Sequence, residues 1–227
     1  MQQLDRKRLL SRRRFLGLAA SGAAAWQLAP WPNTVAAALS AVPPSPAPVI
    51  TPTLEAFSDT MIPGVKRWPG DRAVAGVAPG AGAVQAGAIQ MMNFAPAGIS
   101  PALPAFAALL TTQAEAYATN KQIVLDPTVP ALVALDFDQR TDLLLELLDP
   151  AAPDSIAWFA LSAMPFLAYH TAGYVDTATA MQQGHPGLKA IGFPEPDPDG
   201  LWRFPVFSYG KRLADELPLT SASGSPP

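Results

Sequence analysis

The chain has 227 residues, with 15 basic and 18 acidic side chains and a formal net charge of −3. This balance argues against a nucleic acid or an anionic membrane surface as an electrostatic partner. The chain contains no cysteine, which excludes disulfides, c-type haem attachment, iron–sulfur clusters and cysteine-based zinc sites. Hydrophobic residues make up 49% of the chain, so the sequence predicts a packed domain rather than a disordered one.

The chain begins with a basic segment followed by an apolar one, in the order of an export signal. Two adjacent arginines and a spacer precede Phe-Leu in a twin-arginine pattern made by Ser11, Arg12, Arg13, Phe15 and Leu16. The apolar run behind it is rich in small residues and too short to span a bilayer, so no permanent membrane span is expected. The pattern predicts a twin-arginine signal peptide over residues 1–38, read by the twin-arginine translocase. Export to the periplasm, cell envelope or extracellular space follows from it.

The central part of the chain predicts helices joined by proline-rich connectors. Residues 39–52 form an expected Pro-rich linker, and residues 53–216 an expected mainly α-helical domain of about five to six helices with Pro-rich loops. Caps, prolines and apolar periodicity predict helices over residues 52–62, 80–94, 100–120, 136–149 and 154–174. In the first of them, Thr51 is the expected cap and Pro52 the first helical residue.

The expected core lies on the apolar stripes of these helices. Its members are Leu54, Phe57, Met61, Ile62, Leu103, Phe106, Leu110, Tyr117, Leu143, Leu144, Leu147 and Leu148. Asp136 or Asp138 is expected to cap the fourth helix, and Asp154 or Ser155 to open the fifth. The fifth helix is apolar on all sides, which predicts burial on several faces, and Pro165 is a candidate kink.

The chain changes character over residues 184–210, where proline and glycine dominate and aromatic residues recur. This composition predicts an irregular aromatic arm that either covers its own domain or docks on a partner. The residues expected at a partner interface are Phe193, Trp202, Arg203, Phe204, Phe207 and Tyr209. Residues 217–227 are expected to form a disordered tail.

Catalytic, cofactor and metal patterns are weak in this sequence. The glycine-rich residues 80–87 lack the strand–turn–helix frame of a dinucleotide site. His170, six residues before Asp176, is a conceivable general base but more typical of a core histidine, and His185 begins an expected turn. Glu195 and the acids after it alternate with prolines that stiffen the backbone, which disfavours a calcium loop. We therefore assign no catalytic, cofactor-binding or metal residue.

The order of several motifs resembles the gluconate 2-dehydrogenase subunit 3 family. Besides the signal, the matching elements lie at residues 59–63 (DTMIP), 79–81 (PGA) and 187–194 (GLKAIGFP), with the RTDLLLELL helix between. The resemblance covers residues 11–20 and, loosely, 54–197. Leu188 stands where the family favours Trp, and Glu195 where Gly is usual, so the chain resembles a divergent branch.

The resemblance implies a non-catalytic small subunit. Such subunits escort, stabilise and export a large FAD-dependent oxidoreductase of the glucose–methanol–choline type, so FAD is expected in the partner and no cofactor in this chain. The alternative is an autonomous exported module that binds an apolar ligand between its helices, lined by Met91, Met92 and Met164. An enzyme built on His170 and Asp176 is the third possibility.

Overall fold

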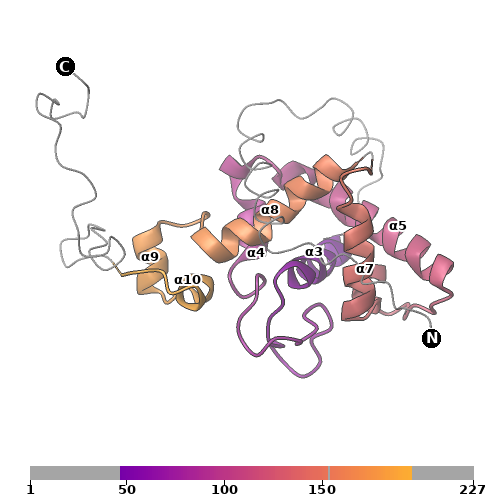
Figure 1. The fold of residues 1–227 in the computed structure, drawn as a ribbon, viewed down its shortest axis with the longest axis horizontal. Coiled ribbons are helices and arrows are strands. Elements are labelled where there is room, and N and C mark those ends of the chain that lie inside the picture. Colours follow the sequence, from indigo (N-terminus) through magenta and orange to yellow (C-terminus); the bar gives the residue numbers. More distant parts are fainter. Residues whose placement is uncertain (1–46, 153, 196–227) are drawn as a thin grey trace, which may run out of the picture. The chain divides into compact units, whose positions relative to one another are not determined.

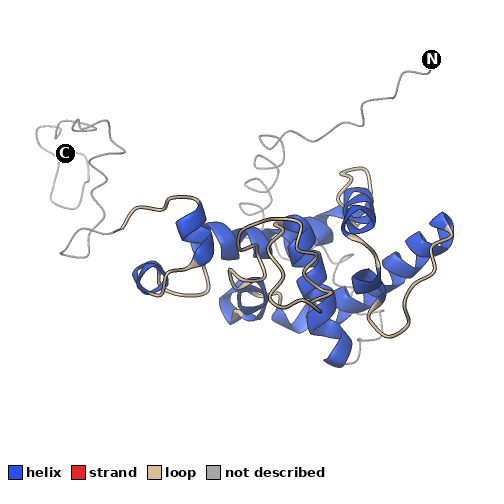
Figure 2. Ribbon diagram, turned by 90° about the horizontal axis from the view of Figure 1, so that it is seen from below, coloured by secondary structure: helices blue, strands red, loops and turns tan. Residues whose placement is uncertain are grey.

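The computed structural model describes residues 47–152 and 154–195, and these residues are mainly α-helical, as predicted. They contain eight α-helices and two short 3₁₀ helices but no strand (Figures 1 and 2). The elements are α3 (Ala47–Met61), α4 (Ala88–Asn93), η1 (Ala95–Ala97), η2 (Ser100–Ala102), α5 (Leu103–Lys121), α6 (Ala131–Ala134), α7 (Phe137–Leu147), α8 (Ser155–Thr171), α9 (Thr177–Gln182) and α10 (Pro186–Ala190). Short helices raise their number above the five to six expected.

The chain divides into two compact units, Met1–Ile191 and Gly192–Pro227. The described helices all belong to the first unit, and only residues 192–195 of the second are described. The signal peptide, most of the expected linker and the expected tail lie outside the described residues.

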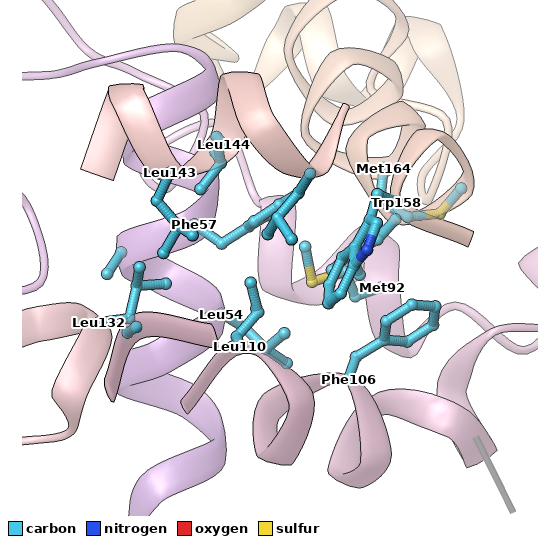
Figure 3. Packing of buried hydrophobic residues seen from close by; sticks show 14 of the residues in the cluster. Leu54, Phe57, Met92, Phe106, Leu110, Leu132, Leu143, Leu144, Trp158 and Met164 are labelled. Atoms are coloured by element: carbon cyan, nitrogen blue, oxygen red, sulfur yellow. The ribbon is translucent and has the colours of Figure 1, made fainter. Parts of the chain in front are cut away.

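Helix α3 is central to the first unit. It packs against α4, α5, α6, α7 and α8, and α8 in turn packs against α4 and α10. Leu54 and Phe57 of α3 point into one hydrophobic cluster that also receives Trp158 of α8 (Figure 3). The Trp158 ring lies tilted against Phe106 of α5, with 5.9 Å between ring centroids. Full burial of each such side chain stabilises the fold by roughly 2–3 kcal/mol.

The expected core residues are buried at all but two positions. Met61 and Ile62 are half-buried at the end of α3, and the others lie in the cluster. Helix α8 buries residues on several of its faces, as its uninterrupted apolarity predicts. It remains one helix across Pro165.

Helix α7 begins where the sequence indicates. The Asp136 side chain accepts a hydrogen bond from the backbone N–H of Gln139, and the Gln139 side chain accepts one from the backbone N–H of Asp136. This reciprocal capping box satisfies two N–H groups that a helix start leaves free. Of the two candidate caps, Asp136 is therefore the one used. The connector before it contains the short α6, which the sequence did not predict.

Two helix starts differ from the prediction. Helix α3 begins at Ala47, so Pro52 lies inside it rather than at its first position and supplies no N–H to the helix there. Before α5, Ser100 and Pro101 form the 3₁₀ helix η2 instead of a side-chain cap. The end of α5 at Lys121 agrees with the sequence.

The prediction of one helix over residues 80–94 was wrong for its first half. Only Ala88–Asn93 are α-helical, because Gly87 has a φ of 83°. A Cβ there would lie 2.2 Å from the hydroxyl of Tyr174. The glycines in this segment allow close contact between loops instead of extending a helix.

The predicted irregular arm also contains a helix at its beginning. His185 accepts a hydrogen bond at Nδ1 from the backbone N–H of Leu188 and so caps α10, where the sequence predicted a turn. Gly187 lets α10 approach α8 closely, since a Cβ on it would lie 2.1 Å from the carbonyl oxygen of Tyr169. Among the described helices, none combines the length and apolarity needed to cross a bilayer.

Candidate functional site

The candidate site is the segment between α3 and α4, residues 63–87, which we call the 63–87 loop. It follows no regular helical pattern over most of its length (Figure 1). Irregular segments of this length within a compact domain are uncommon, and they are usually either functional or linkers. Three charged side chains whose exposed fractions are 2% or less hold it in place: Asp59, Asp71 and Arg140.

Asp59 fixes both ends of the loop's first half. It lies near the end of α3, and its Oδ1 accepts the N–H of Gly64 at 3.0 Å while its Oδ2 accepts the N–H of Ala75 at 2.8 Å. Burial raises the pKa of Asp59, and the hydrogen bonds from Ala75 and Gly64 offset only part of that effect. One carboxylate therefore joins two loop segments that are eleven residues apart.

Arg140 of α7 also holds the loop, by donating hydrogen bonds to two of the loop's backbone carbonyls. Its Nη1 donates to Ala73 at 2.9 Å, and its Nη2 donates to Arg72 at 2.8 Å. Burial lowers the pKa of Arg140, and the charge of Asp59 opposes this.

The same guanidinium also holds the α6 region. Its Nε–H is shared between the carbonyls of Leu132 and Leu135, and Nη2 donates to Val133 as well. Five buried or partly buried carbonyl oxygens thus depend on one side chain. Arg140 was not among the residues singled out from the sequence, because a single arginine at the start of a helix gives no signal of burial.

Asp71 and Arg67 form the outer support of the loop. The Arg67 guanidinium bridges Asp71, with Nε to Oδ2 at 2.7 Å, and Glu55 of α3, with Nη1 to Oε1 at 2.6 Å. Burial acts to raise the pKa of Asp71, but the hydrogen bonds from Arg67 and Val74 outweigh it and the pKa lies below its usual value. Hydrogen bonds to Glu55 and Asp71 raise the pKa of Arg67.

The two ends of the loop meet backbone to backbone. Val65 donates its N–H to the carbonyl of Gly80 at 2.7 Å, and the side chain of Gln85 bonds both Val65 and Gly82. A Cβ on Gly82 would lie 2.5 Å from the nitrogen of Gly64, so only glycine fits there. The two sequence motifs at residues 59–63 (DTMIP) and 79–81 (PGA) are thus neighbours in the fold.

His185 ties α10 to the end of the loop. Its Nε2 lies 3.0 Å from the carbonyl oxygen of Ala86, which also accepts a hydrogen bond from the Tyr174 hydroxyl. Because Nδ1 accepts the N–H of Leu188, Nε2 is the ring nitrogen that donates to the Ala86 carbonyl. Both ring nitrogens are engaged in structural bonds.

His170 and Asp176, considered above as a general-base pair, have two separate structural roles. His170 stacks on Phe166 and meets the edge of Tyr169, and burial lowers its pKa. Asp176 caps α9 by accepting the N–H of Thr179. No hydrogen bond joins His170 to Asp176, both of which lie in the described part of the chain.

The remaining sequence candidates are the three methionines and the aromatic arm. Met91, Met92 and Met164 are buried in the main hydrophobic cluster, and a ligand between the helices stays a prediction. Phe193 lies in the second unit, while Trp202, Arg203, Phe204, Phe207 and Tyr209 lie outside the described residues. Within residues 47–152 and 154–195, no three His, Asp or Glu side chains are placed to share a metal ion.

Comparison with known proteins places the chain in one family. A family model described as a family of unknown function, DUF5987, matches residues 48–227. The chain belongs to this family. No curated protein and no solved structure matches the chain. The match includes α3 from its second residue onward, the 63–87 loop and every described helix after it, so the anchored loop lies inside the family's own domain.

Proposed function

We propose that this protein is a non-catalytic accessory subunit that escorts, stabilises and exports a folded FAD-dependent oxidoreductase of the glucose–methanol–choline type. The twin-arginine pattern at residues 11–16, an address associated with proteins that fold before export, carries the proposal of export, and the resemblance at residues 59–63, 79–81 and 187–194 suggests the class of partner. The oxidoreductase would bind FAD and fold in the cytoplasm, and the complex would then leave on this chain's signal.

The way the chain uses its buried polar groups supports a structural role. Four buried polar side chains bond to backbone groups of the 63–87 loop: Asp59, Asp71, Arg140 and His185. Each bond holds this irregular segment in one conformation. Catalytic groups, by contrast, are aimed at a space that a substrate can enter. Burying charged side chains costs desolvation free energy, and a need for a rigid surface above them would account for that cost.

Export of the pair can be tested in the native host with a tagged full-length chain. The variant Arg12→Lys/Arg13→Lys removes the twin-arginine pattern but keeps the charge, and the control Arg6→Lys/Arg8→Lys changes basic residues outside the pattern. We expect the first variant to retain both the chain and a FAD-dependent dehydrogenase activity in the cytoplasm, whereas the control exports both.

Purification of the exported chain gives the decisive readout. Co-purification of a larger protein with a flavin absorbance spectrum supports the proposal. A lone, flavin-free chain, together with unchanged dehydrogenase activity in the exported fraction of the Arg12→Lys/Arg13→Lys strain, would overturn it.

A further inference from the structure

Helix α7 has one buried side and one side that faces solvent. Its buried residues are Arg140, Leu143, Leu144 and Leu147. The opposite side carries Asp138, Asp142, Leu145 and Glu146, because residues three or four positions apart share a face of a helix. Asp138, Leu145 and Glu146 are exposed, with Leu145 at 54%, and Asp142 is half-buried. We call these four residues the α7 outer face.

The carboxylates of the α7 outer face lie close enough together to act on one neighbouring group. Burial raises the pKa of Tyr117 on α5, and the charges of Asp142, Glu146 and Asp136 raise it further. Asp138 precedes Asp142 by one helical turn. The acids therefore form one negative area beside Tyr117.

This negative area is not neutralised by neighbouring cations. The three ion pairs of the described residues are made by Arg67 and Arg72, and none of them includes a carboxylate of α7. Arg140 lies on the buried side, where its guanidinium bonds to backbone carbonyls. Lys121 lies over the Tyr117 ring, 5.6 Å from its centroid, so one positive charge stands near several carboxylates. The α7 outer face thus keeps a net negative charge.

The chain itself contains a segment of complementary charge and polarity. Six of its 15 basic residues fall within residues 6–14, which contain no acid: Arg6, Lys7, Arg8, Arg12, Arg13 and Arg14. Leu9 and Leu10 stand between the two basic groups, just as Leu145 stands among the acids of the α7 outer face. A negative face with an apolar centre complements a positive segment with an apolar centre.

The connection between this segment and the domain is long enough for the two to meet. Residues 15–46 separate it from the start of α3 at Ala47. An extended chain spans about 3.3 Å per residue, so this connection reaches up to roughly 100 Å, farther than the width of a domain of this size.

We propose that residues 6–14 dock on the α7 outer face of the folded chain. Asp138, Asp142 and Glu146 pair with the two basic groups, and Leu9 and Leu10 cover Leu145. Exposed ion pairs are individually weak, but the contact is intramolecular, and a tether supplies an effective concentration of about millimolar. While the segment is docked, a translocase has to displace it before it can read the arginines. The inference goes beyond the proposed function, since it needs the basic segment but no particular cargo.

Three other occupants fit the α7 outer face less well. A divalent cation needs converging carboxylates, and no three His, Asp or Glu side chains of the described residues are placed to share one. A nucleic acid is repelled by the carboxylates. The same segment of a second copy would make the same contact, but the tether gives the chain's own segment the higher local concentration.

The test is photo-crosslinking of the purified full-length chain, with a photoreactive amino acid at position 10. The chain is taken from the cytoplasm of a host without the translocase, so that the signal is retained. We expect an intramolecular crosslink to residues 137–147, mapped by mass spectrometry, with a yield that does not depend on protein concentration. Its yield should fall at least about three-fold at 1 M salt, where charges are screened beyond about 3 Å.

A pair of matched variants tests the charges of the face. Asp142→Asn/Glu146→Gln removes two of its carboxylates and should lower the crosslink yield about five-fold, the effect of two exposed ion pairs. The control Glu115→Gln/Glu195→Gln removes two exposed acids elsewhere and should leave the yield unchanged. Arg6→Gln/Arg8→Gln should lower the yield as well, and this variant leaves the helical domain untouched.

The outcomes separate this inference from the proposed function. Crosslinks to another element, crosslinks to a second copy or no crosslink at all overturn the docking. It is also overturned if salt and the loss of Asp142 and Glu146 leave the yield unchanged. A crosslink to α7 that behaves as expected, in a chain whose export does not need Arg12 and Arg13, supports the docking and overturns the proposed function.

Discussion

Replacing Arg140 with lysine should destabilise the fold strongly although it keeps the charge. In the native chain four N–H groups of Arg140 serve five carbonyl oxygens, at distances of 2.8–3.0 Å. Lysine has three N–H groups on a single nitrogen and cannot reach carbonyls that surround a planar guanidinium. At least two carbonyls therefore lose their donor.

The magnitude follows from the cost of a buried, unsatisfied carbonyl. At about 1–3 kcal/mol for each group, Arg140→Lys should lower the free energy of unfolding by about 2–6 kcal/mol. A domain of this size is typically stable by about 5–15 kcal/mol, so the loss is a large part of the total. The 63–87 loop should be affected first, because Ala73 and Arg72 lose their contact with α7.

Urea unfolding followed by far-ultraviolet circular dichroism measures this loss. Arg72→Lys is the matched control, because Arg72 makes an exposed pair with Asp126, and such pairs contribute little. We expect the control to unfold at the wild-type urea concentration. If Arg140→Lys came within about 0.5 kcal/mol of wild type, the claim that one guanidinium satisfies these carbonyls would be refuted.

Three further predictions concern single side chains in or beside the loop. Burial raises the pKa of Asp59, so the folded chain keeps that proton to higher pH than the unfolded chain does. Wild type should therefore lose stability relative to Asp59→Asn as the pH rises from about 4 through the folded pKa. Urea unfolding between about pH 3 and pH 8 measures this, and a constant difference in unfolding free energy between the two proteins would contradict it. Gly82→Ala should lower the free energy of unfolding by about 1–3 kcal/mol, since its Cβ would lie 2.5 Å from backbone atoms. Gly80→Ala, with open space around it, should leave stability unchanged or raise it by up to about 1 kcal/mol. Equal melting temperatures of the two variants would argue against the close approach at Gly82. Thr53→Val should raise the free energy of unfolding by about 1 kcal/mol, because the Thr53 hydroxyl is buried without a hydrogen-bond partner, and a lower melting temperature would show that the hydroxyl does have one.

Local patterns predicted much of the fold because the forces behind them are local. The apolar spacing of α5 and α7 and the capping pair of Asp136 and Gln139 act within a few residues, and both helices lie where the sequence puts them. The prediction failed where a distant contact decides the backbone. Residues 80–87 look helical by composition, but Gly82 meets Gly64 and Gly87 meets Tyr174, and these contacts exclude a helix.

The candidate site could be predicted only in fragments. The sequence singles out residues 59–63 and 79–81 as motifs. Nothing in the sequence shows that Asp59 is buried or that it bonds the backbone of Ala75, sixteen residues away. Arg140 gave no signal at all, since its five acceptors are backbone carbonyls, which every residue has.

By itself the sequence determined the mainly helical class, the positions of α5, α7 and α8, and most of the core, because hydrophobic periodicity and capping are properties of short segments. It also contains the twin-arginine pattern, which is read as a linear motif and needs no folded context. Tertiary structure alone decided that the loop after α3 extends to Gly87 and which contacts hold it. The physical reason is that Asp59, Asp71 and Arg140 are stable in the interior only when backbone groups from distant parts of the chain bond them, and that requirement gives the loop its shape.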